Sequence, residues 1–178
     1  MSSFQQWTTR ISILFLVVFC LNTKGLAGSQ RIIPPLQLIN EKPPNCLFKK
    51  ECARLSISVL HTGVDYMAEP KTSVFSVCDG RVVLNATNRD IWNSFLIVRH
   101  QKCNGYDDLY AYYGHIISEI SSGSAVKQGQ IVGLVKEWPG IPQNSHLHFG
   151  LSTKYHSSGW GYQAGNLDSK GWLDPEKL

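Results

Sequence analysis

Short runs of β-branched and aromatic residues, separated by turn residues, fill most of the chain after residue 54. Runs of this length and spacing are typical of strands in an all-β domain. No window of 11–18 residues repeats its apolar side chains with the period of an amphipathic helix, so any helix should be short. We therefore expect a mainly antiparallel all-β fold, with strands near Leu55–Leu60, Ser73–Val77, Arg81–Leu84, Phe95–Arg99, Leu109–Tyr113, Gln130–Val135 and His146–Ser152.

The length and the charge of the chain are those of one folded domain. The sequence has 178 residues, of which 43% are hydrophobic, with 17 Lys and Arg against 13 Asp and Glu. Two of the basic residues, Arg10 and Lys24, precede the expected mature chain and leave it a formal charge of only +2. So small an excess does not indicate a nucleic-acid-binding surface.

The first 27 residues have the pattern of an export signal. Arg10 precedes an apolar run, Ile11–Leu21, and small residues follow at Gly25 and Ala27, where a signal peptidase would cut. The run is much shorter than the roughly 20 residues that cross a bilayer, so we expect no stable membrane anchor. We therefore expect a signal peptide over residues 1–27 and a mature protein that is periplasmic or extracellular.

Two further parts follow the expected signal peptide. Residues 28–54 contain four prolines, which do not fit inside a helix or a central strand. We expect this segment to be an extended arm, followed by one domain over residues 55–178 that ends in a glycine-containing tail. We expect the mature chain to be a monomer.

Four cysteines remain after the expected signal peptide, namely Cys46, Cys52, Cys78 and Cys103. An even number in an exported chain indicates disulfides, and four cysteines allow three pairings. The local pairs Cys46–Cys52 and Cys78–Cys103 are favoured, because the first closes a short loop and the second lies near the ends of two strand-like runs. A cysteine zinc site would need a closer spacing than that between Cys46 and Cys52.

Two short histidine patterns could hold a metal ion. The first is His61-x-Gly63-x-Asp65 and the second is His146-x-His148. In a strand, residues two apart point to one face about 7 Å apart, so His146 and His148 would face one site. Gly63 permits a bend that brings His61 and Asp65 together. Imidazoles with a carboxylate are typical ligands of catalytic zinc, whereas a surface ion pair beside a polar strand face is the alternative.

Five segments occur in order between about Leu60 and Leu151. They are His61-x-Gly63-x-Asp65, Gly80-x-Val82, Tyr113-Gly114-His115, Val126-x-x-Gly129-Gln130 and His146-x-His148-Phe149-Gly150. Together they resemble the lysostaphin/LytM family of zinc endopeptidases, which cut peptidoglycan cross-bridges or stem peptides. The resemblance covers most of the expected mature chain.

The resemblance implies a fold, a cofactor and a set of site residues. The implied fold is a two-sheet β-hybrid or sandwich with an open active-site groove, as in lysostaphin-like peptidases. The implied metal ligands of one Zn²⁺ per chain are His61, Asp65 and His148, and the implied catalytic residues are His115 and His146. Because all five positions hold the required residue types, the resemblance implies an exported zinc metalloendopeptidase that hydrolyses peptide bonds in peptidoglycan cross-links or stem peptides.

Two other functions fit parts of the pattern. One is a non-catalytic peptidoglycan-binding or amidase-activating module of the same fold. The other is a D-Ala-D-Ala-type zinc peptidase, which needs a wider His-to-Asp spacing and a glutamate three residues before a ligand histidine, where this chain has Gln143. The sequence leaves open which bond is cut, whose wall is the target, and which of His115 and His146 acts as the base.

Aromatic residues near the expected site are candidates for the lining of a peptide groove. Alternate residues of a strand face opposite sides, so at least half of these candidates should belong to the core. The candidates are Tyr66, Tyr110, Tyr112, Tyr113 and Trp138.

Overall fold

The computed structural model describes residues 28–37, 44–52 and 58–178. The expected signal peptide over residues 1–27 lies outside the described residues, as do part of the arm and the first half of the expected strand Leu55–Leu60. Within the described part of the chain, no helix combines the length and the hydropathy that crossing a bilayer requires.

The described residues form short strands and three single-turn 3-10 helices. The 3-10 helices are η1 (Ile91–Asn93), η2 (Pro142–Asn144) and η3 (Pro175–Lys177). The strands are β1 (Leu60–His61), β2 (Gly63–Met67), β3 (Ser73–Phe75), β4 (Gly80–Asn85), β5 (Phe95–Cys103), β6 (Tyr106–Gly114), β7 (Ile116–Ile117), β8 (Ala125–Val126), β9 (Ile131–Val135), β10 (His146–Ser152), β11 (Tyr162–Gln163) and β12 (Trp172–Leu173).

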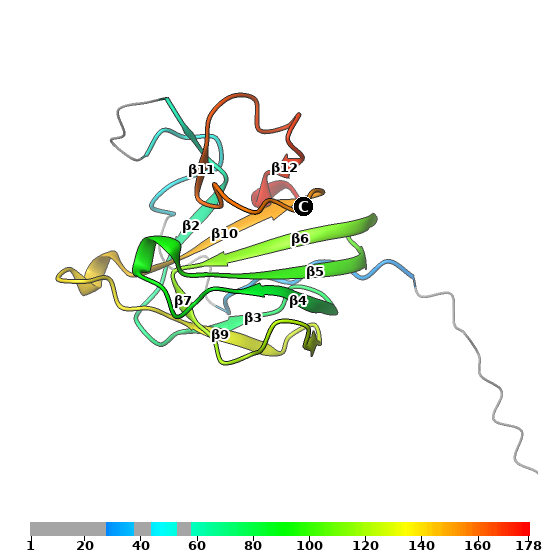
Figure 1. Ribbon diagram of the computed structural model, residues 1–178, viewed down its shortest axis with the longest axis horizontal. Helices are drawn as coiled ribbons and strands as arrows, with labels where there is room; N and C mark the ends of the chain where they lie inside the picture. The colour runs from blue at the N-terminus through cyan, green and yellow to red at the C-terminus, as the bar shows by residue number, and fades with distance from the viewer. Residues whose placement is uncertain (1–27, 38–43, 53–57) are drawn as a thin grey trace, which may run out of the picture.

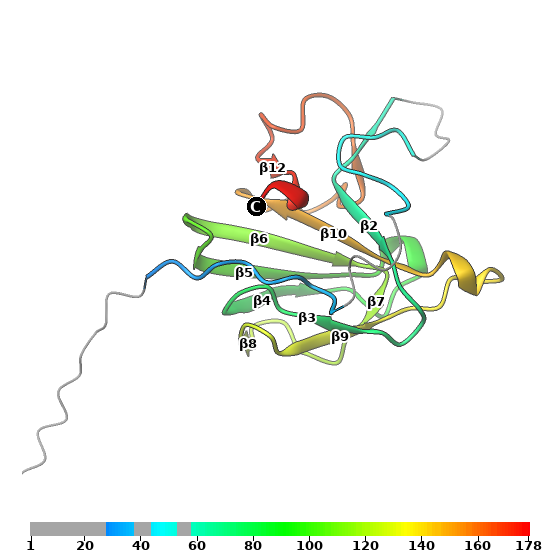
Figure 2. The same ribbon diagram turned by 180° about the vertical axis from the view of Figure 1, so that it is seen from behind.

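Antiparallel pairing joins these strands into one large sheet and two small ones. The large sheet has the order β12-β10-β6-β5-β4-β8, and β2 also pairs with β10. The second sheet has the order β3-β9-β7, and β1 pairs with β11 in the third. Figure 1 shows β3, β7 and β9 below the large sheet and the C-terminal segment above it, and Figure 2 shows the same arrangement from behind.

The main core lies between the large sheet and the three-stranded sheet. Leu147, Phe149 and Leu151 of β10 belong to this core, where Phe149 packs against Tyr113 of β6 with ring centroids 5.3 Å apart. Because side chains alternate along a strand, His146 and His148 point to the opposite face of the sheet. A smaller core on that face contains Phe95, Ile97, Tyr112, Leu167 and Trp172.

The all-β expectation is confirmed. Four predicted strands lie wholly within β4, β5, β6 and β10, whereas β3 and β9 are shorter than the ranges predicted for them. One strand, β2, lies where the sequence predicts a glycine bend. The chain bends at Thr62 instead, and Gly63 is the first residue of β2. Glycine is needed there because a Cβ would lie 2.4 Å from the carbonyl oxygen of Phe149 in β10. The predicted bend at Gly63 is therefore wrong, although His61 and Asp65 do converge.

Both favoured cysteine pairs, Cys46–Cys52 and Cys78–Cys103, form disulfides. The first closes a loop in the arm, and the second joins the segment before β4 to the end of β5. The arm also pairs with β2, since the N–H of Asp65 donates to the carbonyl of Cys46 at 2.8 Å. Two disulfides are typical of a chain that folds in an oxidising compartment.

Replacement of Gly63 by alanine should destabilise the protein. The added Cβ would meet the Phe149 carbonyl at 2.4 Å, so β2 and β10 would have to separate. Overpacking of this kind costs about 1–3 kcal/mol, which urea unfolding followed by circular dichroism would measure. Gly161→Ala is the matched control, because its Cβ meets nothing within 4 Å. An equal loss of stability in both variants would contradict this explanation.

Protonation of His100 should destabilise the fold in acid. His100 is fully buried, and burial lowers its pKa from 6.5 to about 4 despite a hydrogen bond to the Asp79 carbonyl. The unfolded chain therefore takes up a proton below pH 6.5, whereas the folded chain does so only near pH 4. This contribution to stability is complete above pH 6.5 and falls by about 3 kcal/mol as the pH drops through 4.

Urea unfolding at several pH values would measure this effect against His100→Gln, which does not titrate. The variant should become more stable relative to the wild type as the pH falls from 7.5 to 4. A difference in stability that stays constant over this range would refute the role of His100.

Candidate metal centre

The register of three adjacent strands brings the predicted site residues together. His148 of β10 lies opposite Asp65 of β2 on one side and opposite Gly114 of β6 on the other. His115 directly follows Gly114, so it also reaches this row. A Cβ on Gly114 would lie 3.0 Å from the Cβ of His148 and 2.7 Å from the ring of Phe95. Glycine at this position therefore leaves room for the His148 side chain.

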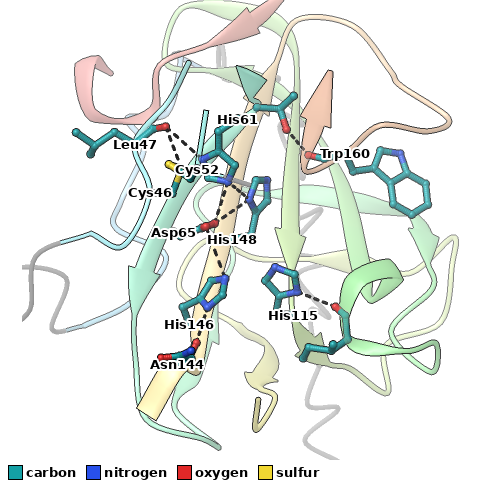
Figure 3. Close-up of polar contacts among 12 residues, drawn as sticks. Cys46, Leu47, Cys52, His61, Asp65, His115, Asn144, His146, His148 and Trp160 are labelled. Carbon is teal, nitrogen blue, oxygen red and sulfur yellow. Dashed lines mark hydrogen bonds and ion pairs between the residues drawn. A yellow bond between two sulfur atoms is a disulfide. The ribbon is translucent and has the colours of Figure 1, made fainter. Parts of the chain in front are cut away.

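Three side-chain atoms form a compact triangle at the centre of the site (Figure 3). His61 Nε2 lies 2.9 Å from His148 Nδ1, and Asp65 Oδ1 lies 3.0 Å from each of these nitrogens. Ligands of a tetrahedral zinc ion at 2.0–2.1 Å are about 3.3 Å apart, so the triangle is close to the size that such an ion needs. We call His61, Asp65 and His148 the three-residue cluster.

The two imidazoles of the three-residue cluster face its centre with different ring nitrogens. His61 Nδ1 lies 3.3 Å from the carbonyl oxygen of Leu47, which leaves Nε2 of the neutral ring as the unprotonated atom. His148 enters the cluster through Nδ1 instead, and its buried Nε2 has no hydrogen-bond partner among the described residues. Cys46 Sγ also lies within 4.8 Å of the ligand atoms of His61 and Asp65, but its disulfide removes it as a thiolate ligand.

Two further imidazoles, His115 and His146, stand beside the three-residue cluster (Figure 3). Their ring centroids lie 4.7 Å apart. A backbone carbonyl orients each ring by accepting a hydrogen bond from Nδ1. His115 Nδ1 lies 2.7 Å from Ile91 O, and His146 Nδ1 lies 2.7 Å from Asn144 O. A neutral imidazole that donates from Nδ1 has its lone pair on Nε2. The Nε2 atom of His146 lies 3.7 Å from Asp65 Oδ2.

The backbone at His115 is unusual. Its φ of 58° lies in the left-handed region, which residues other than glycine rarely adopt. Hydrogen bonds on both sides hold it there, from the His115 N–H to Ser94 O and from the Lys136 N–H to His115 O. A strained backbone that is fixed in this way often marks a functional residue.

Burial and charge set the protonation states of the site. Burial alone would raise the pKa of Asp65, but its hydrogen bonds and charge interactions with His148 and His61 outweigh burial and hold that pKa below its usual value. Burial lowers the pKa of His148, and burial together with repulsion from His146 and His148 lowers the pKa of His115 to about 3. At neutral pH the site thus combines the ionised carboxylate of Asp65 with the neutral imidazole of His148, which are the forms that bind a metal ion.

All five predicted site residues line one cavity of about 260 Å³. Of the predicted aromatic residues, only Trp138 lines it. Tyr66, Tyr112 and Tyr113 are buried in the two cores, and Tyr110 packs against Tyr155 with ring centroids 5.8 Å apart.

Two aromatic residues that no sequence pattern singles out also line the cavity. They are Trp92 in η1 and Tyr162 in β11. The ring of Tyr162 lies 4.9 Å from that of His61, and burial, with a smaller effect of the Asp65 charge, raises its pKa to about 12. Neither residue has a fixed spacing from the histidines. A helix-capping aspartate, Asp90, is the one local signal near Trp92.

Comparison with known proteins identifies sequence relatives. The sequence model of Peptidase family M23 matches residues 59–159. A DD-carboxypeptidase/endopeptidase Mpg of Neisseria meningitidis serogroup B is 32% identical over 90 residues, which are 51% of this chain and 19% of that protein. The protein of the same name from Neisseria gonorrhoeae matches with the same identity and coverage. This chain therefore spans about a fifth of the length of the curated relatives that it matches.

Solved structures have the same fold. The catalytic domain of the antimicrobial peptidase lysostaphin from Staphylococcus simulans aligns with a TM-score of 0.58 at 18% identity, covering 82% of this chain and 97% of that one. LytU aligns with a TM-score of 0.52 at 17% identity, covering 75% of this chain and 81% of that one. The lysostaphin-like fold that the sequence predicts is thereby confirmed.

Replacement of one member of the three-residue cluster should abolish metal binding. The wild type should bind one Zn²⁺, and a thousandfold excess over Kd should add about 4 kcal/mol to its stability. His148→Gln should lose both effects, as measured by equilibrium dialysis and thermal melting. His156→Gln is the matched control, because His156 is a partly buried imidazole that stacks on Trp172 outside the cavity. Stoichiometric zinc in His148→Gln would contradict the assignment.

Proposed function

The chain belongs to peptidase family M23, and from this premise we propose that it is a zinc metalloendopeptidase of peptidoglycan. The observation that carries the proposal is the convergence of His61, Asp65 and His148 to within 3.0 Å, beside two more imidazoles in one cavity. The Neisseria relatives carry the name DD-carboxypeptidase/endopeptidase. The family resemblance of the motifs supports peptidoglycan cross-links or stem peptides as the substrate.

The three-residue cluster is the proposed site of one zinc ion per chain. His61 Nε2, Asp65 Oδ1 and His148 Nδ1 are the three ligand atoms. Two neutral imidazoles and one carboxylate match the ligand set of catalytic zinc sites, which keep one position open. When bound, zinc supplies a Lewis acid that polarises a peptide carbonyl and makes water acidic enough to react at neutral pH.

His115 and His146 are the proposed proton carriers. Hydrolysis of a peptide bond requires that the attacking water lose a proton and that the leaving amine gain one. The carbonyls of Ile91 and Asn144 hold both rings in the tautomer whose Nε2 can accept a proton. An imidazole that has been protonated at Nε2 can then donate to the leaving amine, or to the carbonyl oxygen as negative charge develops on it.

Imidazole takes the place of a carboxylate base in this proposal. Proteases with an H-E-x-x-H motif use its glutamate as the general base, and this sequence contains no such string. Burial and the neighbouring imidazoles lower the pKa of His115, so that ring is neutral at pH 7 and its Nε2 lone pair is unprotonated.

We also propose that the protein is exported. The two disulfides support an extracytoplasmic protein. In this proposal residues 1–27 are a signal peptide, residues 28–54 are an arm and residues 55–178 are the peptidase domain. The mature chain is a monomer without a membrane anchor, and it acts in the periplasm or outside the cell.

The zinc-loaded protein should release fragments from intact peptidoglycan sacculi. Release should stop on chelation and return with added zinc, and mass spectrometry of the fragments would identify the bond. Absence of release by a folded protein that carries one zinc ion would refute the enzyme and favour the binding or amidase-activating module.

His115→Ala gives this experiment its matched variant. It should bind one zinc ion and lose turnover by at least about 100-fold, the usual contribution of a general acid or base. His156→Ala should retain both properties, because His156 lies outside the cavity. Loss of zinc in His115→Ala would show instead that His115 is a ligand.

A further inference from the structure

Two tryptophans form one wall of the cavity, on the side of His115 and His146. The rings of Trp92 and Trp138 pack edge to face, with centroids 4.8 Å apart and planes at 84°. Trp92 leaves 64% of its surface exposed, whereas Trp138 is half-buried. Neither residue has a part in the proton transfers described above. We call Trp92 and Trp138 the tryptophan wall.

The loop that carries Trp92 is fixed by polar contacts. Asp90 caps η1 by accepting hydrogen bonds from the backbone N–H of Trp92 at 3.0 Å and of Asn93 at 3.2 Å. The Lys136 ammonium donates to the carbonyls of Thr87 at 2.8 Å and Arg89 at 2.7 Å, which ties this loop to the end of β9. The backbone that carries the exposed indole is therefore fixed, and a ligand that binds to the indole would have little chain to order.

The same loop serves the catalytic imidazoles. Ile91, which precedes Trp92, provides the carbonyl that orients His115. On the other side, the ring of Trp138 stacks on that of His146, with centroids 5.0 Å apart and planes at 27°. The backbone N–H of Trp138 also donates to the hydroxyl of Ser145, the residue before His146. The wall and the two imidazoles thus form one connected unit.

We propose that the tryptophan wall is a subsite for the peptide substrate and that Trp138 is also a positioning residue for His146. This inference rests on the peptidase function proposed above. An indole presents a broad apolar face that suits the amide planes and short alkyl side chains of an extended peptide. Trp92 offers such a face to solvent beside the proposed proton carriers, while Trp138 restricts rotation of the His146 ring by stacking on it.

Binding without turnover tests the subsite. In zinc-loaded protein that carries His115→Ala, Trp92→Ala should raise the dissociation constant for intact peptidoglycan sacculi about fivefold to tenfold, the loss expected for one aromatic contact. Tyr155→Ala in the same background is the matched control, since Tyr155 is an aromatic residue with 48% exposure that does not line the cavity. Equal dissociation constants for these two variants would overturn the subsite.

Turnover tests the positioning role. With His115 intact, Trp92→Ala should raise KM by a similar factor and change kcat less than twofold. Trp138→Leu should lower kcat about tenfold and change KM less than twofold, because the His146 ring loses the surface that holds it. Trp138→Phe should restore most of kcat, since phenylalanine keeps a stacked ring. Zinc content should stay at one ion per chain throughout, and an unchanged kcat in Trp138→Leu would overturn the role.

The two proposals can fail separately. If the wild type releases no fragments but Trp92→Ala still weakens binding to sacculi, the subsite stands and the peptidase function falls. If the wild type hydrolyses sacculi and Trp92→Ala binds as tightly as Tyr155→Ala, the function stands and the subsite falls.

Discussion

The pairing of β10 with β2 and β6 is the constraint on which the rest of the site depends. The residues of β10 that fill the main core, Leu147, Phe149 and Leu151, alternate with the two histidines on the opposite face. A shift of register by one residue would exchange the two sets, so burial of the apolar set also fixes where the imidazoles lie. Hydrophobic burial, which is indifferent to metal ions, therefore determines the geometry of a polar cluster.

Main-chain carbonyls face the Nδ1 atoms of three of the four imidazoles in the cavity and fix their tautomers. Leu47, Ile91 and Asn144 come from three separate segments, and each places an oxygen near the Nδ1 atom of a different ring. In many metal sites a carboxylate has this task, and a point substitution can remove it. Here the tautomers depend on how three segments fold, so no single side-chain replacement deletes one of these hydrogen-bond acceptors.

The sequence predicted the elements whose side chains follow a simple period. The strand β10 and the same-face placement of His146 and His148 follow from alternation. The Cys46–Cys52 disulfide follows from its short loop, and Cys78–Cys103 from the position of both cysteines near strand ends. Features that depend on contacts between distant segments were missed. Gly63 is required by the approach of a neighbouring strand, and Trp92 reaches the cavity because its loop is tied to the end of β9. The tyrosines of β6 were ambiguous for the same reason, since only the packing of both sheet faces shows which of them are enclosed.

Residues of the arm, which precede the region that matches the family, also contact the three-residue cluster. The family match begins at residue 59, yet the carbonyl that faces His61 belongs to Leu47, and the backbone of Asp65 is hydrogen-bonded to Asn45 and Cys46. The five polar side chains lie within the region that matches the family, whereas some of the backbone that contacts them lies before it. The region that matches the family and the set of residues that builds the cluster therefore have different boundaries.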